Sequence, residues 1–254
     1  MMRASFPLDS TPAFRASMPD RYLKAFDRTA VSEHAAIVAR RAGAQAHVEV
    51  WRQQAKGVGV LCVVADDRPG LLSFISAALV MQGMDVLSAQ AYTRRVPGSE
   101  GTSEAVDFLW LRRDGGDHAM PLGEVDIERI DALLRQLIKG EVSIESAVER
   151  ARSSRTVPPG ATTRVTFDED ADEGLAVLTV ETFDRPGLLL AITRALFRAG
   201  VQIIASDAVT RASAVVDRFT IVELDGSPIR RNRRGVVQIE VLGAIDALSR
   251  PQPA

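Results

Sequence analysis

The chain has 254 residues, of which 46% are hydrophobic and 25% are charged, and its formal net charge at pH 7 is −2. This composition is typical of a globular protein, and the length allows two modules of roughly 100 residues, each able to bury its own core. A near-neutral charge lacks the basic excess with which proteins neutralise nucleic-acid phosphates, so we expect no nucleic-acid partner.

Cys62 is the single cysteine, which excludes an intrachain disulfide, and its place in an apolar run favours a buried, inert thiol. No run reaches the roughly 18 apolar residues of a membrane span. The first residues are interrupted by Pro7, Asp9 and Pro12, unlike a secretory signal. We therefore expect a cytoplasmic protein with no membrane partner.

Residues 1–45 are predicted to form an N-terminal extension with one helix. Residues 1–19 carry three prolines, which favours loose order. Helical spacing then runs from Thr29 to Arg41, and Gly43 provides a stop.

An internal repeat organises the rest of the chain. The segment DRPGLLSFISAALVMQGMDVLSAQAYTR, from Asp67, aligns without gaps on DRPGLLLAITRALFRAGVQIIASDAVTR, from Asp184, at an offset of 117 residues. Thirteen of the 28 positions are identical. Such a repeat predicts two copies of one structural module, and we expect them over residues 46–140 and 162–254, joined by a linker helix and loop over residues 141–161.

Each copy shows the same succession of periodicities. A short β-branched run predicts a buried strand, a Pro-Gly turn follows, and apolar residues at spacings of three and four then predict a helix. Two strands and a second helix complete the copy. In the first copy we expect strands over 58–65, 84–93 and 104–112 and a closing helix over 125–139; in the second, strands over 175–182, 201–210 and 214–224 and a helix over 236–249.

One further strand candidate precedes each copy, over residues 47–52 and 163–168. A fourth strand would make each copy a ferredoxin-like βαββαβ unit, an α+β (α/β) fold with an antiparallel sheet. Residues 162–168 could complete the first module, and residues 47–52 could then fill the vacancy in the second. This hypothesis predicts two modules interlocked by strand exchange.

The repeated turn offers a place for a carboxylate. It joins a strand to a helix start, where the first backbone N–H groups lack intrahelical acceptors. Gly70 and Gly187 allow close approach to the backbone, and Pro69 and Pro186 stiffen the turn. Asp67 and Asp184 are candidates for ligand contact, with a role as helix N-caps as the even alternative.

The arrangement resembles the ACT family of regulatory amino-acid-binding domains. "DRPGLL" follows a hydrophobic strand, and a helix ends in Gly before "MDVLSAQAYT" or "VQIIASDAVT". The resemblance implies an effector held between two modules, by the turn of one and the helix-following strand of the other. The implied ligand-binding residues are Asp67, Arg68, Pro69, Gly70, Leu71 and Asp85 in the first copy and Asp184, Arg185, Pro186, Gly187, Leu188 and Gln202 in the second. Many family members have Asn where this chain has Asp85 and Gln202.

The tandem pair also resembles the C-terminal regulatory region of the bacterial uridylyltransferase/uridylyl-removing enzymes, which modify the PII signal protein. The segment "MPDRYLKAF…SEHAAIVARR", residues 18–41, extends this likeness to nearly the whole chain. The resemblance implies a role in nitrogen signalling and makes glutamine the first ligand to test. It also implies self-association or a signalling protein as partner.

We expect no enzyme activity, no catalytic residue, no cofactor and no metal. The three histidines, His34, His47 and His118, are not followed by Asp as a His-Asp metal hydrolase would require. G-x-S-x-G, P-loop and G-x-G-x-x-G motifs are all missing from the sequence. Two alternatives stay open: a dimerisation scaffold without a ligand, or the regulatory part of a uridylyltransferase-type enzyme.

Overall fold

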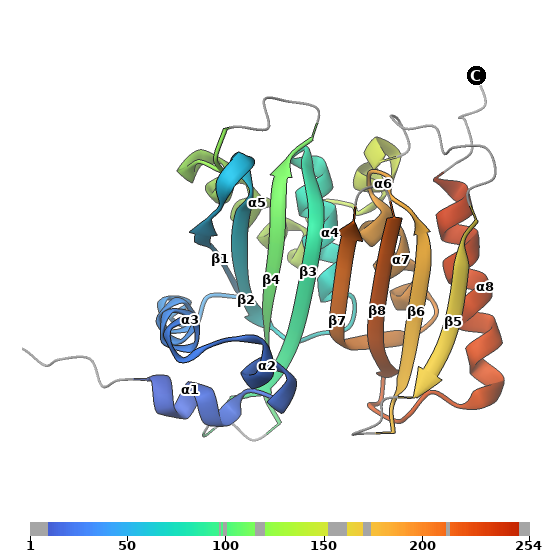
Figure 1. Ribbon diagram of the computed structural model, residues 1–254, viewed down its shortest axis with the longest axis horizontal. Helices are drawn as coiled ribbons and strands as arrows, with labels where there is room; N and C mark the ends of the chain where they lie inside the picture. Colours follow the sequence, from blue (N-terminus) through green and yellow to red (C-terminus); the bar gives the residue numbers. More distant parts are fainter. Residues whose placement is uncertain are drawn as a thin grey trace, which may run out of the picture.

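A computed structural model describes residues 10–96, 98, 101–114, 120–151, 162–169, 174–211 and 214–248. The eight strands of these residues form a single antiparallel sheet in the order β1-β2-β4-β3-β7-β8-β6-β5 (Figure 1). The first four strands come from the first copy of the repeat and the last four from the second. The predicted α+β class with antiparallel sheets is thus confirmed.

The two copies contain the same elements in the same order. The first consists of β1 (Ala46–Gln53), β2 (Gly59–Asp66), α4 (Leu71–Met81), β3 (Met84–Arg95), β4 (Ser103–Arg113) and α5 (Glu124–Lys139). The second consists of β5 (Arg164–Glu169), β6 (Ala176–Phe183), α7 (Leu188–Arg198), β7 (Val201–Arg211), β8 (Ala214–Glu223) and α8 (Arg231–Ala247). Between them lies α6 (Glu145–Ala151), within the linker expected over residues 141–161.

The extra strand of each copy pairs with its own neighbour. β1 pairs with β2, and β5 pairs with β6, both antiparallel. Among the strands that the structure describes, the exchange expected from the spacing is therefore not found, and residues 162–168 complete the second module instead of the first. Each module runs ββαββα, so the strand expected last in βαββαβ comes first. Only a few residues separate the paired strands, and such a short connection favours pairing with the adjacent strand.

The two modules meet edge to edge through β3 and β7. Ser88 pairs with Val209 and Tyr92 with Ala205, with Gln90 opposite Asp207 at the centre. At the repeat offset the pair Ser88–Val209 corresponds to the pair Ala205–Tyr92, and Gln90 faces its own equivalent. A local two-fold axis therefore relates the modules. This symmetry brings the strand-to-helix turn of each module close to the other module.

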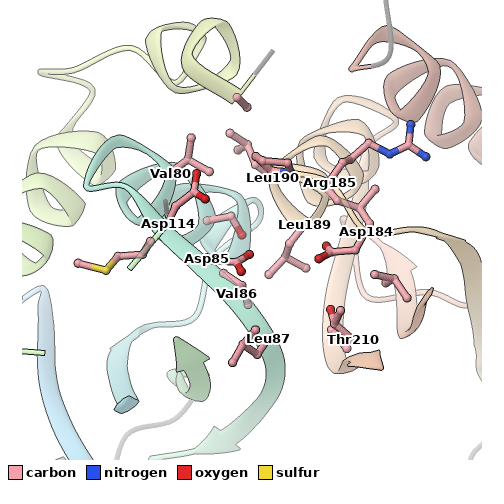
Figure 2. A pocket seen from close by; sticks show the side chains of 18 of the residues that line it. Val80, Asp85, Val86, Leu87, Asp114, Asp184, Arg185, Leu189, Leu190 and Thr210 are labelled. Atoms are coloured by element: carbon pink, nitrogen blue, oxygen red, sulfur yellow. The ribbon is translucent and has the colours of Figure 1, made fainter. Parts of the chain in front are cut away.

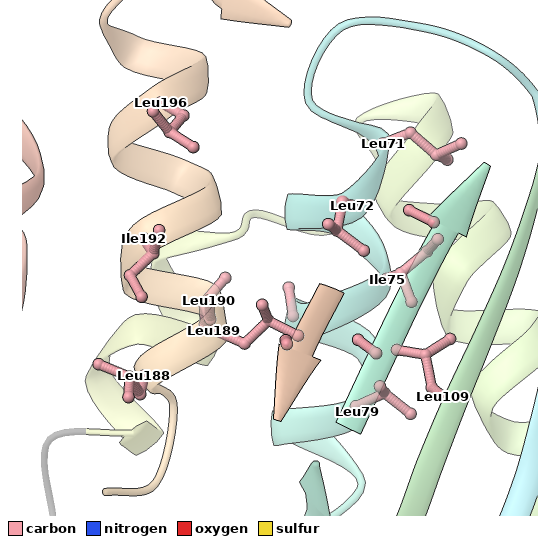
Figure 3. Packing of buried hydrophobic residues seen from close by; sticks show 14 of the residues in the cluster. Leu71, Leu72, Ile75, Leu79, Leu109, Leu188, Leu189, Leu190, Ile192 and Leu196 are labelled. Atoms are coloured by element: carbon pink, nitrogen blue, oxygen red, sulfur yellow. The ribbon is translucent and has the colours of Figure 1, made fainter. Parts of the chain in front are cut away.

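Helices α4, α5, α7 and α8 lie on one face of the sheet (Figure 1). Buried leucines and isoleucines of α4 and α7, among them Leu72, Ile75, Leu190 and Leu196, share one core with the inner face of the sheet (Figure 3). The core is thus continuous across the boundary between the modules, which fixes their relative position.

Helices α1 (Thr11–Ser17), α2 (Asp20–Ala25) and α3 (Arg28–Arg40) contribute to a second core with residues of β2, β3 and β4. Tyr22 is fully buried in it and contacts the rings of Phe26, Tyr92 and Phe108. The helix predicted near residues 29–41 is confirmed as α3. The looseness expected for residues 1–19 is wrong for 11–17, because Phe14 packs into this core; residues 1–9 lie outside the described residues.

The closing helix of the second module begins at Arg231 and not near Val236 as expected. Arg233 pairs with Glu223 at 3.0 Å and Arg234 with Glu169 at 3.1 Å. These ion pairs stabilise the arginine-rich residues 231–234 as the first turn of α8. Across the described part of the chain, every helix is too short or too polar to cross a membrane.

Candidate functional site

The turn between β6 and α7 lies against the first module. Gly187 takes the left-handed conformation, with φ 73°, directly before the first residue of α7. The Leu188 N–H donates to the Arg185 carbonyl at 3.1 Å, which closes the turn. The next N–H groups of α7 lack intrahelical acceptors and carry the positive end of the helix dipole. A φ of this sign suits glycine and strains any other residue.

A cavity of about 270 Å³ separates this turn from the first module. Asp85 and Asp184 point toward each other from opposite sides of it (Figure 2). Val80 and Ser76 of α4, together with β3, form the opposite wall. The structure therefore brings Asp85 together with Asp184, Arg185, Pro186, Gly187 and Leu188, which joins the turn expected from one copy to the strand expected from the other.

Two of these predicted residues are held by other protein groups. Arg185 is buried, donates to the Thr182 hydroxyl at 2.8 Å and the Phe183 carbonyl at 3.2 Å, and points its guanidinium away from the cavity (Figure 2). Asp85 accepts from Arg112 at 2.8 and 3.0 Å. Arg185 thus fixes the turn, while the Asp85 carboxylate has its charge partly neutralised.

The helix-cap interpretation of Asp67 and Asp184 is wrong. The N-cap positions are Gly70 and Gly187, and neither helix has a side-chain cap hydrogen bond. Asp184 instead lines the cavity, and Asp67 accepts from Gln202 at 3.3 Å.

A buried acid faces each turn and was missed as a site residue. Asp217 of β8 pairs with Val180 of β6, and Asp107 of β4 occupies the equivalent position opposite Val63 of β2. Each is 3% exposed. The signal was present in the sequence, since "VD" recurs in the two matching strands, AVDFLWL and VVDRFTIVEL, where an alternating apolar pattern gives no place for a charge.

Burial strongly raises the pKa of both carboxyl groups. Burial, followed by the charge of Asp184, raises the pKa of Asp217 to about 7. Burial, followed by the charge of Asp67, likewise raises the pKa of Asp107 to about 8. Asp217 lines the cavity, so a cation placed between Asp184 and Asp217 would favour their ionised forms.

The equivalent place in the first module is closed. Around Asp67, Arg68, Gly70 and Leu71 the remaining space is about 30 Å³, room for about two water molecules. Phe197 of α7 lies over this turn, since a Cβ added to Gly70 would lie 2.9 Å from its ring. The structure thus brings the predicted residues of this copy together with the second module but leaves no ligand-sized space between them.

The histidine and cysteine positions offer no metal site in the described ranges, where no group of three His, Cys, Asp or Glu side chains could hold an ion. Cys62 is fully buried, as expected from its strand. His118 lies outside the described residues.

Curated relatives of the chain include bifunctional uridylyltransferase/uridylyl-removing enzymes. The chain is 33% identical over 218 residues to a bifunctional uridylyltransferase/uridylyl-removing enzyme of Rhodospirillum rubrum, a match covering 82% of this chain and 22% of the relative. The enzymes of Gluconobacter oxydans and Phenylobacterium zucineum match at 31% and 28% identity, over 82% and 90% of this chain and 22% and 24% of their own length.

No protein-family model matches the chain. Among solved structures, an aspartate kinase from Synechocystis superposes with a TM-score of 0.20 at 12% identity, covering 78% of this chain and 42% of that one. A TM-score this low does not establish a common fold. The chain spans about a fifth of the length of the curated relatives it matches. Most of its own length is similar to one region of these uridylyltransferase/uridylyl-removing enzymes.

Proposed function

We propose that the chain is a non-catalytic regulatory module of the ACT type that binds a free amino acid in the cavity between β3 and the α7 turn. The observation that carries this proposal is the chemistry of the cavity walls. The start of α7 presents backbone N–H groups, while Asp184 of the turn and Asp217 of β8 present carboxyl groups to the same cavity. An amino acid carries a carboxylate and an ammonium on one carbon, so both ends find a complementary partner.

The charge of the cavity favours a ligand with an uncharged side chain. Its walls contain four aspartates and two arginines, Arg150 and Arg185. Asp85 is paired with Arg112 and the Arg185 guanidinium points away from the cavity, so carboxyl groups still outnumber arginines in its walls. An additional carboxylate on the ligand would be repelled, so glutamine is favoured over glutamate.

Regulation follows if the ligand binds one arrangement of the modules better than another. The cavity is lined by both modules, so a bound amino acid would strengthen their contact. We further propose that the change in this contact alters how the chain binds a second copy of itself or a signalling protein, in the cytoplasm. The similarity to the uridylyltransferase/uridylyl-removing enzymes supports a place in nitrogen signalling, as a regulatory and not a transferring part.

Titration calorimetry of the chain with glutamine, glutamate and the other common amino acids tests the proposal. We expect glutamine to bind at one site per chain and glutamate to bind at least tenfold more weakly. Absence of binding for every amino acid would favour the dimerisation scaffold.

Asp217→Asn provides a matched variant with a two-part signature. Loss of the counter-charge should weaken glutamine binding about 10- to 100-fold, as expected when one partner of a buried charge pair is removed. The same change should stabilise the unliganded chain, because the buried carboxyl no longer resists ionisation. Weaker binding through misfolding would instead lower the stability.

A further inference from the structure

The two turn sites share their backbone but differ in the space they enclose. Gly70 and Gly187 both precede a helix in the left-handed conformation, with φ 81° and 73°. The cavity at Gly187 measures about 270 Å³ and that at Gly70 about 30 Å³. The local two-fold axis relates the two turns, but α6 lies at only one of them: Arg150 and Ala151 line only the cavity at Gly187, and a Cβ added to Gly187 would clash with the side chain of Ala151. The difference in space therefore comes from α6 and from the side chains around the turns.

One pair of equivalent side chains differs in bulk beside the two turns. Val80 in α4 corresponds to Phe197 in α7, at the repeat offset of 117 residues. Val80 lines the open cavity, whereas Phe197 lies over the Gly70 turn, where a Cβ added to Gly70 would come within 2.9 Å of its ring. A phenyl ring therefore stands where the open site has a short branched side chain.

Phe197 is held over the turn by a second aromatic ring. Its ring centroid lies 6.3 Å from that of Phe74, in an edge-to-face arrangement. The residue equivalent to Phe74 in the second module is Ala191, which gives no such support. Phe197 is nevertheless 38% exposed, so one side of the ring closes the site while the other meets solvent.

The polar groups at the closed site are also engaged with each other. Gln202 of β7 donates to the Asp67 carboxylate at 3.3 Å across the module boundary. At the open site the equivalent Asp85 bonds to Arg112 in its own module, and both Asp85 and Asp184 line the cavity. A ligand at the closed site would have to displace a ring and compete with a hydrogen bond.

We infer that Phe197 is an internal plug that limits the chain to one amino-acid site out of two inherited from the repeat. The inference rests on the proposed function, because it concerns the same ligand at the symmetry-related position. It assigns Phe197 and Val80 as the residues that decide the number of sites, in place of the turn residues, which the copies share.

Exchanging the two side chains tests the inference. Phe197→Val should open the second site and raise the glutamine stoichiometry in calorimetry from one to two per chain. Val80→Phe should close the first site and reduce glutamine binding at least 100-fold. Val80→Ala, which leaves the first cavity open, should keep a stoichiometry of one.

Two outcomes separate this inference from the function on which it rests. Suppose that the original chain binds one glutamine and that Phe197→Val, shown to be folded by circular dichroism, also binds one. The proposed role of Phe197 would then be wrong, while the proposed amino-acid sensor would be unaffected. Phe197→Ala provides a second variant without the ring, in case Phe197→Val refolds poorly. If the original chain binds no amino acid, the sensor and the plug fail together.

Discussion

Replacing Asp107 with asparagine should stabilise the chain on the order of 5 kcal/mol at pH 8. Burial raises the pKa of this carboxyl to about 8 from the 3.8 of an exposed aspartate. The folded state therefore holds a proton that the unfolded chain releases. Stability from this group is complete below pH 3.8 and is lost as the pH rises toward 8, by about 1.4 kcal/mol per unit. Asparagine removes that loss.

The pH window between 7 and 8 isolates this effect. Asp217 contributes in the same direction, but only up to its pKa of about 7. Burial lowers the pKa of His34 to about 3, so that residue acts in the opposite direction, between pH 6.5 and 3. Urea unfolding at pH 7, 7.5 and 8 should show a falling stability in the original chain and a flatter profile in Asp107→Asn.

Glu104 on the same strand provides the control. It is 5% exposed, but it accepts from Arg41 at 2.6 Å and from Arg94 at 2.7 Å. Glu104→Gln should destabilise the chain, since the buried Arg94 would lose its carboxylate partner and Arg41 would keep only Asp66. Equal changes in stability in Asp107→Asn and Glu104→Gln would contradict the difference between Asp107, whose pKa is raised by burial, and Glu104, which is paired with arginines.

Replacing Tyr22 with alanine should cost about 3–5 kcal/mol of stability, the range for a buried aromatic side chain. Tyr22 is fully buried and its ring centroid lies 4.9 Å from that of Phe26 and 5.3 Å from that of Tyr92. It thereby joins helices α1–α3 to the sheet face opposite the cavity. Trp51 and Trp110 pack against the same core, so their fluorescence during urea unfolding reports the loss.

Tyr22→Phe separates the ring from the hydroxyl. The hydroxyl lies 2.7 Å from Nδ1 of the buried His34, and its removal leaves that nitrogen without its partner, at about 1–3 kcal/mol. We expect the phenylalanine variant to fall between the original chain and Tyr22→Ala. A loss below 1 kcal/mol in the alanine variant would show that the N-terminal helices contribute little to the fold.

The repeat made most of the fold predictable. Its gapless alignment set both modules, and local periodicity placed α5 and β3 within a few residues of their bounds. Strand order was not predictable in the same way, because the equal spacing of the extra strands is compatible with pairing within a module or between modules. The structure decides for the shorter connection, β1 with β2 and β5 with β6.

The candidate site was predictable as a pair of turns, but not its asymmetry. The shared Pro-Gly turns point to two sites, and the structure brings both against the opposite module. Whether each is open depends on Val80 and Phe197, which meet the turns only when the modules dock. Asp107 and Asp217 could have been found from their repeated position in two apolar strands.

A titration of ¹⁵N-labelled chain with glutamine, followed by the backbone amide resonances, tests the central claim most directly. The claim is that an amino acid occupies the cavity between β3 and the α7 turn. It predicts saturating shifts for Gly187, Leu189 and Asp85, with Gly70 and Leu72 at the closed turn unchanged. Equal shifts at both turns, or saturation confined to residues away from the module boundary, would contradict it.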